Sequence, residues 1–247
     1  MTPRDAALEA LLQMERRGAW SDGSLKRITA QAGLDGRDAA LCTHLTYGVV
    51  QNRTLLDFYI DGWCSQRAAR LETVVACALR LGIYQILFMD KVPDRAAVHE
   101  TVELVKRHGK SRAAGMVNAV LRKCAASKNA LPPLPHKGAA ERLTVQYSHP
   151  KWLVERLIAL VGEQEAEEFL RLDNEPVPTV IQTNTLKTTP DALAEELRAS
   201  GVQVQAHPWL TGCFEVTGTG DMARLPAFAE GRCTVQDAAA RLTAMVT

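Results

Sequence analysis

Apolar residues recur at helical spacing through the first 125 residues, and no alternating strand pattern interrupts them. Leu41, Leu45 and Val49 follow one another every four residues, and a longer apolar stripe runs from Leu71 to Ile86. This period places apolar side chains on one face of each helix, and each helix must bury that face against others. The pattern predicts an all-α bundle of about six or seven helices over residues 1–125.

The pattern changes after residue 125. Residues 126–144 open with ASKNALPPLPHKG, which holds three of the eleven prolines and has no helical period, and they predict a linker. Residues 145–232 then predict a small α+β domain, because a leucine-rich helix and an acidic helix precede the order strand, helix, strand, strand. The fold class is therefore expected to be mainly α, with a helical bundle followed by a small α+β domain. The expected strands lie at 179–183, 202–205 and 213–216.

The final segment, residues 233–247, predicts the beginning of a further domain. Residues 231–237 have the pattern of a strand followed by a helix cap, and an apolar helix opens at Ala238. The sequence reaches Thr247 inside that helix, without the polar residues or cap that usually close one. We therefore expect this segment to be part of a domain that is longer than the residues present.

The charge is divided unevenly along the chain. The net charge is +1, but residues 1–130 carry 19 Lys and Arg against 13 Asp and Glu, a balance of +6, and residues 131–247 carry 10 against 15, a balance of −5. A basic front half suits an anionic partner such as RNA, although ordinary solvated helix faces give the same balance. Two basic patches are candidate phosphate contacts: Lys106, Arg107, Lys110 and Arg112, and Arg16, Arg17, Lys26 and Arg27.

Several function classes are disfavoured. The longest apolar run is far short of the 18 residues that a membrane helix needs, and the N-terminus lacks the features of a secretory signal, so a cytoplasmic protein without membrane contact is expected. The six cysteines contain no Cys-x-x-Cys spacing and predict buried, reduced thiols rather than a metal site. The string TGTG at 217–220 predicts a turn. His149 is expected to be a capping or packing residue.

The front half resembles the NusB-type helical domain in the form that is fused to bacterial rRNA cytosine-5 methyltransferases, the RsmB or Sun family. Two strings are specific for this resemblance, LRLGIYQIL at 79–87 and VNAVLR at 117–122. Supporting strings are GRD at 36–38, TYGV at 46–49, LLD at 55–57, VP at 92–93 and AAVHE at 96–100. Together these strings span most of residues 1–125.

The back half resembles the same family. YSHPKWLV at 147–154 is similar to its linker-helix signature, and NTLK at 184–187 is similar to its R-x-N-x-L-K strand, although Gln182 stands where that pattern has Arg. VQDAA at 235–239 is similar to the string that leads into the catalytic domain, so the resemblance identifies 233–247 as the start of a methyltransferase domain that binds S-adenosylmethionine. The resemblance therefore covers nearly the whole chain.

The resemblance also implies chemistry that these residues do not supply. The family binds S-adenosylmethionine through a Gly-rich loop and uses two cysteines, one after Pro and one after Thr. None of the six cysteines here follows Pro or Thr. We therefore assign no catalytic, cofactor-binding or metal-binding residue, and S-adenosylmethionine is expected only for the full-length family protein.

Three functions follow as alternatives. The first is the RNA-binding, targeting portion of a 16S rRNA cytosine-C5 methyltransferase, which grips rRNA without methylating it. The second is a NusB-type antitermination module that binds RNA or a protein partner in the regulation of transcription. The third is a helical interaction domain that does not touch RNA. The presence of residues 145–247 favours the first alternative over the second.

Overall fold

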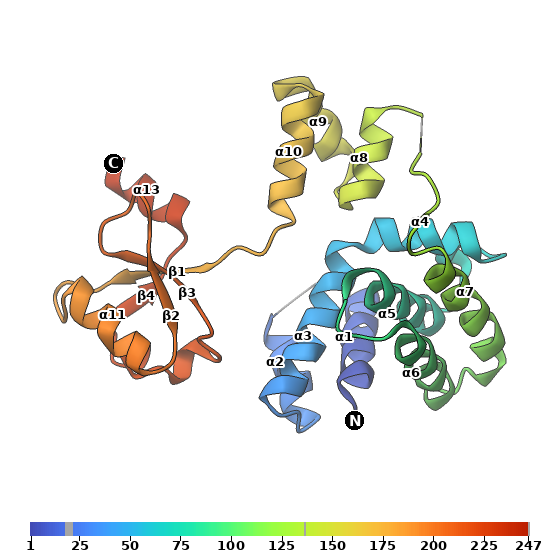
Figure 1. Cartoon of the computed structure of the whole chain (residues 1–247), viewed down its shortest axis with the longest axis horizontal. Coiled ribbons are helices and arrows are strands. Elements are labelled where there is room, and N and C mark those ends of the chain that lie inside the picture. The colour runs from blue at the N-terminus through green and yellow to red at the C-terminus, as the bar shows by residue number, and fades with distance from the viewer. Residues whose placement is uncertain (18–21, 136, 247) are drawn as a thin grey trace. The chain divides into compact units, whose positions relative to one another are not determined.

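The computed structural model describes residues 1–17, 22–135 and 137–246, with the side chains of Arg17 and Asp22 excepted. The chain divides into two compact units, Met1–Asn174 and Glu175–Thr247. The first unit is helical and the second is built around a small sheet (Figure 1). The predicted fold class, mainly α with a helical bundle followed by a small α+β domain, is confirmed.

Seven α-helices make up residues 1–126 of the described chain, which confirms the predicted all-α bundle. The long helix α5 is central, since every residue from Val75 to Ile86 is buried. Its neighbours α1, α3, α4, α6 and α7 pack around it. Their bounds are α1 Pro3–Arg17, α2 Asp22–Gln31, α3 Gly36–Gln51, α4 Arg53–Trp63, α5 Thr73–Phe88, α6 Asp94–Arg107 and α7 Ala114–Ala126, with short 3₁₀ turns η1 at Ala68–Arg70 and η2 at Ser111–Ala113.

Two glycines allow neighbouring helices to approach α5. A Cβ atom on Gly48 would lie 2.0 Å from Tyr84 Cζ, so only glycine leaves room for the tyrosine ring between α3 and α5. A Cβ atom on Gly82 would lie 2.7 Å from Leu121 Cδ2. The glycines of the strings at 46–49 and 79–87 therefore serve close packing, the second against the leucine of VNAVLR.

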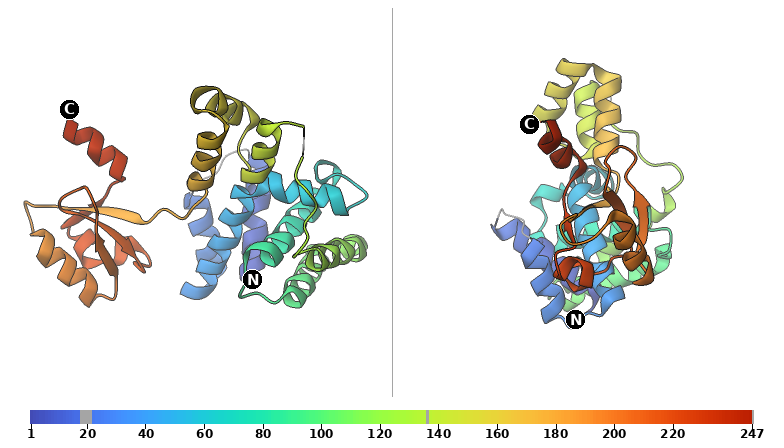
Figure 2. Two further views of the ribbon diagram at one scale, coloured as in Figure 1. Left: turned by 45° about the horizontal axis from the view of Figure 1, so that its top comes forward. Right: turned by 90° about the vertical axis from the view of Figure 1, so that its left-hand side faces the viewer.

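Three further helices complete the first unit: α8 Ala139–Tyr147, α9 Lys151–Val161 and α10 Glu163–Asp173. They pack together through buried Leu143, Val154 and Leu170, and α8 also packs against α4 (Figure 2). Helix α8 begins within the segment that the sequence predicts as a linker, because Leu143 gives it an apolar side that α9 and α10 cover. These three helices are part of the same compact unit as the helical bundle, and the sheet forms the other unit.

The turn between α8 and α9 joins three helices. Ser148 has a left-handed backbone (φ 57°) and its hydroxyl accepts a hydrogen bond of 3.1 Å from the Leu55 amide at the start of α4. The ring of His149 bonds the Tyr147 carbonyl at 2.8 Å and the Asp173 carboxylate at 2.9 Å. His149 therefore has the packing and capping role that the sequence predicts.

The second unit is a four-stranded antiparallel sheet in the order β2-β3-β1-β4, with helices α11 and α12 on one face. Ile181, Phe214 and Val216 on the sheet pack against Leu193 and Leu197 of α11. The three predicted strands are confirmed, and the turn predicted at 217–220 is present, with positive φ at both of its glycines. The bounds are β1 Thr179–Thr183, α11 Pro190–Ala199, β2 Gln203–Ala206, β3 Cys213–Thr217, η3 Met222–Arg224, α12 Pro226–Ala229, β4 Cys233–Val235 and α13 Ala238–Val246.

Candidate nucleic-acid interface

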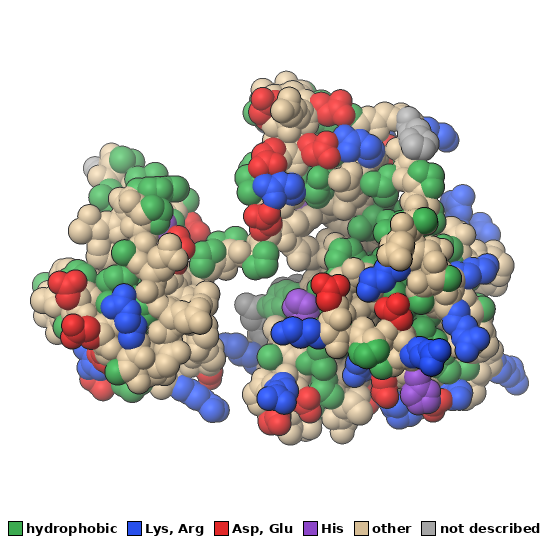
Figure 3. Space-filling view, in the orientation of Figure 1, with side chains coloured by type: hydrophobic (Ala, Val, Ile, Leu, Met, Phe, Trp, Pro, Cys, Tyr) green, Lys and Arg blue, Asp and Glu red, His purple; other side chains and the backbone are tan. Residues whose placement is uncertain are grey.

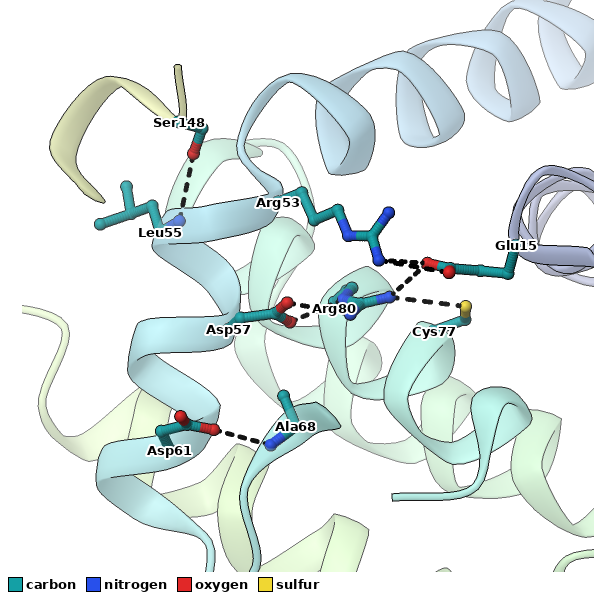
Figure 4. Close-up of polar contacts among 9 residues, drawn as sticks. All are labelled: Glu15, Arg53, Leu55, Asp57, Asp61, Ala68, Cys77, Arg80 and Ser148. Carbon is teal, nitrogen blue, oxygen red and sulfur yellow. Dashed lines mark hydrogen bonds and ion pairs between the residues drawn. The ribbon is translucent and has the colours of Figure 1, made fainter. Parts of the chain in front are cut away.

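The arginine of the string LRLGIYQIL at 79–87 is a buried residue that links helices. Arg80 on α5 is 5% exposed, and its guanidinium donates to both oxygens of Asp57 on α4, at 2.7 and 2.9 Å, and to Glu15 on α1 at 3.0 Å (Figure 4). Although burial alone would lower it, these two carboxylates hold the pKa of Arg80 above its ordinary value. The positive charge of Arg80 is balanced by the carboxylates of Asp57 and Glu15 inside the fold. Arg80 therefore links three helices and is not available to bind a ligand.

The first predicted basic patch lies at the end of α6 and the start of η2, and three of its four cations already have acidic partners. Lys106 Nζ lies 2.7 Å from Glu103 Oε1, and Arg107 Nε lies 3.2 Å from Asp5 Oδ1. Lys110 pairs with Glu72. Only Arg112, which is exposed, has no ion pair among the described residues. The patch therefore presents less free positive charge than its sequence indicates.

The second predicted patch is freer. Lys26 and Arg27 are exposed on α2, and Arg16 is exposed near the end of α1. None of these three has an ion pair within the described part of the chain. The side chain of Arg17 lies outside the described residues. Three cations of this patch are therefore available to an anionic partner.

A groove that no sequence pattern predicts runs between α6 and α7. Its volume is about 850 Å³. One wall is a stripe of α6 that contains Arg95, His99 and Lys106, and the other is a stripe of α7 that contains Asn118 and Arg122. The remaining lining residues are Asp94, Val98, Val102, Glu103 and Ala125. In space-filling view, Lys and Arg side chains gather on the side of the helical unit that carries these two helices (Figure 3).

Helical spacing explains why these polar residues meet. Arg95, His99 and Lys106 lie four and seven residues apart, and Asn118 and Arg122 lie four apart, so each set shares one helix face. Sequence alone could have shown the two polar faces. It could not show that the faces oppose each other, because that depends on how α6 packs against α7.

The cysteines are poor candidates for nucleophilic chemistry. Five of the six are buried. Burial raises the pKa of the Cys77 thiol to about 11 and that of Cys124 to about 12, and it also raises the pKa of Cys42, Cys213 and Cys233. A nucleophilic cysteine needs the opposite shift and access to substrate. The sixth, Cys64, lies with its sulfur 3.7 Å from Met116 Sδ.

The described residues offer neither a metal site nor a membrane-spanning helix. No group of three or more His, Cys, Asp or Glu side chains in these residues is arranged to hold a metal ion. Of the helices described, none is long and apolar enough to cross a membrane.

The fold defines a class of protein with a helical bundle of the NusB type and a sheet unit of ferredoxin-like order. Residues 1–126 match the NusB family, which is half of the chain, and the chain therefore belongs to that family. Residues 149–223 match the ferredoxin-like domain of RsmF/B-like methyltransferases. These two matches cover both halves of the chain.

The particular relatives join both parts in one protein. A probable ribosomal RNA small subunit methyltransferase B of Bacillus subtilis is 31% identical over 98% of this chain, and its counterpart in Synechocystis is 30% identical over 100%. The chain spans 53% and 55% of these relatives, about half of their length. The solved structure of PH0851 aligns over 100% of the chain with a TM-score of 0.69 at 22% identity, a likeness of fold.

Proposed function

We propose that this chain is the RNA-binding, targeting portion of an S-adenosylmethionine-dependent rRNA cytosine-C5 methyltransferase. The observation that carries the proposal is the union, in one chain, of a NusB-family bundle and an RsmF/B-like ferredoxin-like domain. In this proposal residues 1–125 and 145–232 hold 16S rRNA, residues 233–247 begin the methyltransferase domain, and the protein acts in the cytoplasm.

The charge of the described surface supports RNA as the partner. Arg16, Lys26, Arg27 and Arg112 are exposed cations without an ion pair among the described residues. Free arginines and lysines bind phosphates and release the counterions that surround RNA, and this release makes the affinity depend on salt. Lys106, Arg107 and Lys110 contribute less, because binding RNA requires them to leave Glu103, Asp5 and Glu72.

The residues present do not fit S-adenosylmethionine. A Gly-rich nucleotide-binding loop connects a strand of a parallel sheet to a helix. The sheet here is antiparallel throughout its described strands, and the turn at 217–220 leads from β3 into the short η3. The role that we propose for the described residues is therefore to hold the rRNA substrate.

Binding of a fluorescently labelled 16S rRNA transcript to the 247-residue chain tests the proposal. We expect saturable binding that weakens at least tenfold between about 50 and 200 mM salt. The Lys26→Glu/Arg27→Glu variant should weaken binding more than Lys106→Glu/Arg107→Glu, once both are shown to fold. Failure of the wild-type chain to bind rRNA at 50 mM salt contradicts the proposal.

A transcription antitermination module is the second candidate, and the NusB-family bundle is the observation that favours it. The ferredoxin-like unit counts against it, because the relatives that carry both parts are named as methyltransferases. Affinity purification separates the two. Recovery of rRNA with the chain supports the first function, and recovery of transcription-elongation factors without rRNA supports the second.

A further inference from the structure

The polar residues that line the α6–α7 groove do not take part in packing the hydrophobic core. In AAVHE at 96–100 and VNAVLR at 117–122, the buried side chains are apolar: Ala97, Val98, Val117, Val120 and Leu121. The polar members His99, Asn118 and Arg122 instead line the groove. The same helices therefore contribute apolar side chains to the core and polar side chains to the groove, with Val98 of α6 at the boundary between the two.

The cations of this groove differ in how freely they can bind. Its two carboxylates each have a lysine partner: Glu103 with Lys106 at 2.7 Å, and Asp94 with Lys128 at 3.7 Å. Arg95 and Arg122 are exposed, one on each wall, and neither has an ion pair among the described residues. The free positive charge of the groove is therefore concentrated in two arginines that face a common space.

Arginine is well suited to bind phosphate, because its planar guanidinium donates two parallel hydrogen bonds to phosphate oxygens. The wall on α6 extends from Arg95 to Lys106, about 16 Å at the rise of an α-helix, which is long enough for several phosphates of a strand. Asn118 and His99 add hydrogen-bonding groups between the cations, and such groups read the edges of unpaired bases.

We propose that the α6–α7 groove is an RNA-binding site, in which Arg95 and Arg122 hold the backbone of a single-stranded segment and Asn118 contacts a base. This inference rests on the proposed RNA-binding function and adds a site to the two predicted patches. RNA is the occupant that we propose, because guanidinium groups bind phosphate oxygens and the α6 wall is long enough for several phosphates of a strand. An acidic protein segment in the groove is the outcome that the test must separate.

The test compares Arg95→Glu/Arg122→Glu with Arg67→Glu/Arg70→Glu in the full chain. Arg67 and Arg70 are exposed at η1, so the control makes the same change of charge in the same unit without touching α6 or α7. The probe is the labelled 16S rRNA transcript, titrated at several salt concentrations. Circular dichroism and thermal unfolding of each variant confirm that it folds.

We expect the groove variant to bind the transcript at least tenfold more weakly, with the slope of log affinity against log salt reduced by about 1.4, since each phosphate contact to a single strand contributes about 0.7. The control should stay within about twofold of the wild type. Asn118→Ala should lower affinity while leaving the salt slope unchanged, because an amide releases no counterion.

Two results overturn the inference and leave the proposed function intact. One is a groove variant that binds rRNA like the wild type, and the other is a groove variant that keeps rRNA but loses a protein recovered with the wild-type chain. A wild-type chain that fails to bind rRNA at low salt overturns the proposed function as well. The affinity of the wild type therefore distinguishes the two failures.

Discussion

The two units each contain an arginine held between two carboxylates, and the two arginines differ in depth. Arg80 in the helical unit is 7% exposed at its side chain and joins α5 to Asp57 of α4 and Glu15 of α1. Arg232 in the sheet unit is more open to solvent and joins the start of β4 to Glu196 of α11 and the neighbouring Glu230. Arginine–carboxylate ion pairs link three helices in the helical unit, and in the sheet unit they link the start of a strand to a helix.

This difference shows where a polar group determines the fold. In the helical unit, removing Arg80 leaves the Asp57 carboxylate without an ion pair in the described part of the chain and leaves Glu15 with only the exposed Arg53. In the sheet unit, water can replace Arg232, and stability depends on the apolar contacts of Ile181, Leu197 and Phe214. The helical unit is therefore expected to be sensitive to a single buried charge, and the sheet unit to a single buried apolar side chain.

Arg80→Ala is expected to have the largest effect. Because it leaves Asp57 without an ion pair among the described residues and Glu15 with only the exposed Arg53, it should lower the free energy of unfolding of the helical unit by about 3–5 kcal/mol. Chemical denaturation measures this change. Arg53→Ala is the matched control, since Arg53 also binds Glu15 but its side chain is 54% exposed, and it should cost about 0.2–1 kcal/mol. Equal effects of the two variants would contradict the comparison.

Leu197→Ala should act on the sheet unit. Leu197 is 2% exposed between α11 and the sheet, and its loss leaves a cavity that costs about 3 kcal/mol. Leu186→Ala is the control in the same unit, because Leu186 is 95% exposed and should change little. Hydrogen exchange reports on each unit separately. In the Leu197→Ala variant, the amides of β1, β3 and α11 should lose protection from exchange, and the amides of α5 should keep their protection. A loss of protection that is equal in α5 would show that the units do not unfold separately.

Ser148→Ala should have a smaller effect, confined to the helical unit. The hydroxyl of Ser148 accepts from the Leu55 amide and so caps α4, whose own N-cap residue Asn52 makes no side-chain bond there. Losing a cap costs about 1 kcal/mol. Thermal unfolding and exchange of the Leu55 amide measure the change. An unprotected Leu55 amide in the wild type would refute the capping role.

Asp5→Asn should have the smallest effect and should depend on pH. Burial raises the pKa of Asp5, but hydrogen bonds from Thr2 and Arg107 outweigh it and hold the pKa below its ordinary value of 3.8. A lowered pKa gives stability that is present at neutral pH and is lost as the pH falls below 3.8 through the folded value. The variant should therefore be less stable than the wild type at pH 7, and the difference should shrink as the pH falls below 3.8. A difference that persists in acid would assign the effect to packing.

Sequence alone predicted the parts of the fold that depend on local pattern. The helical period placed the bundle, the alternation at β2 placed a strand, and the glycines at 217–220 placed a turn. The predicted linker ends at residue 144, past the start of α8, because the nine residues of that helix directly follow a proline-rich segment.

The candidate site was predicted only in part, for a physical reason. Lys106, Arg107 and Lys110 stand together in the sequence, but Asp5 and Glu72 reach two of them from elements far away along the chain. The groove forms where α6 packs against α7, and no local sequence pattern predicts this tertiary packing. Clusters of charge were therefore visible in the sequence, and their neutralisation was not.

The salt dependence of rRNA binding by the intact 247-residue chain tests the central claim most directly. The account predicts saturable binding of a 16S rRNA transcript whose affinity falls steeply between about 50 and 200 mM salt. A chain that is folded, as shown by its helical circular dichroism, and that leaves the transcript unbound at 50 mM salt would contradict it.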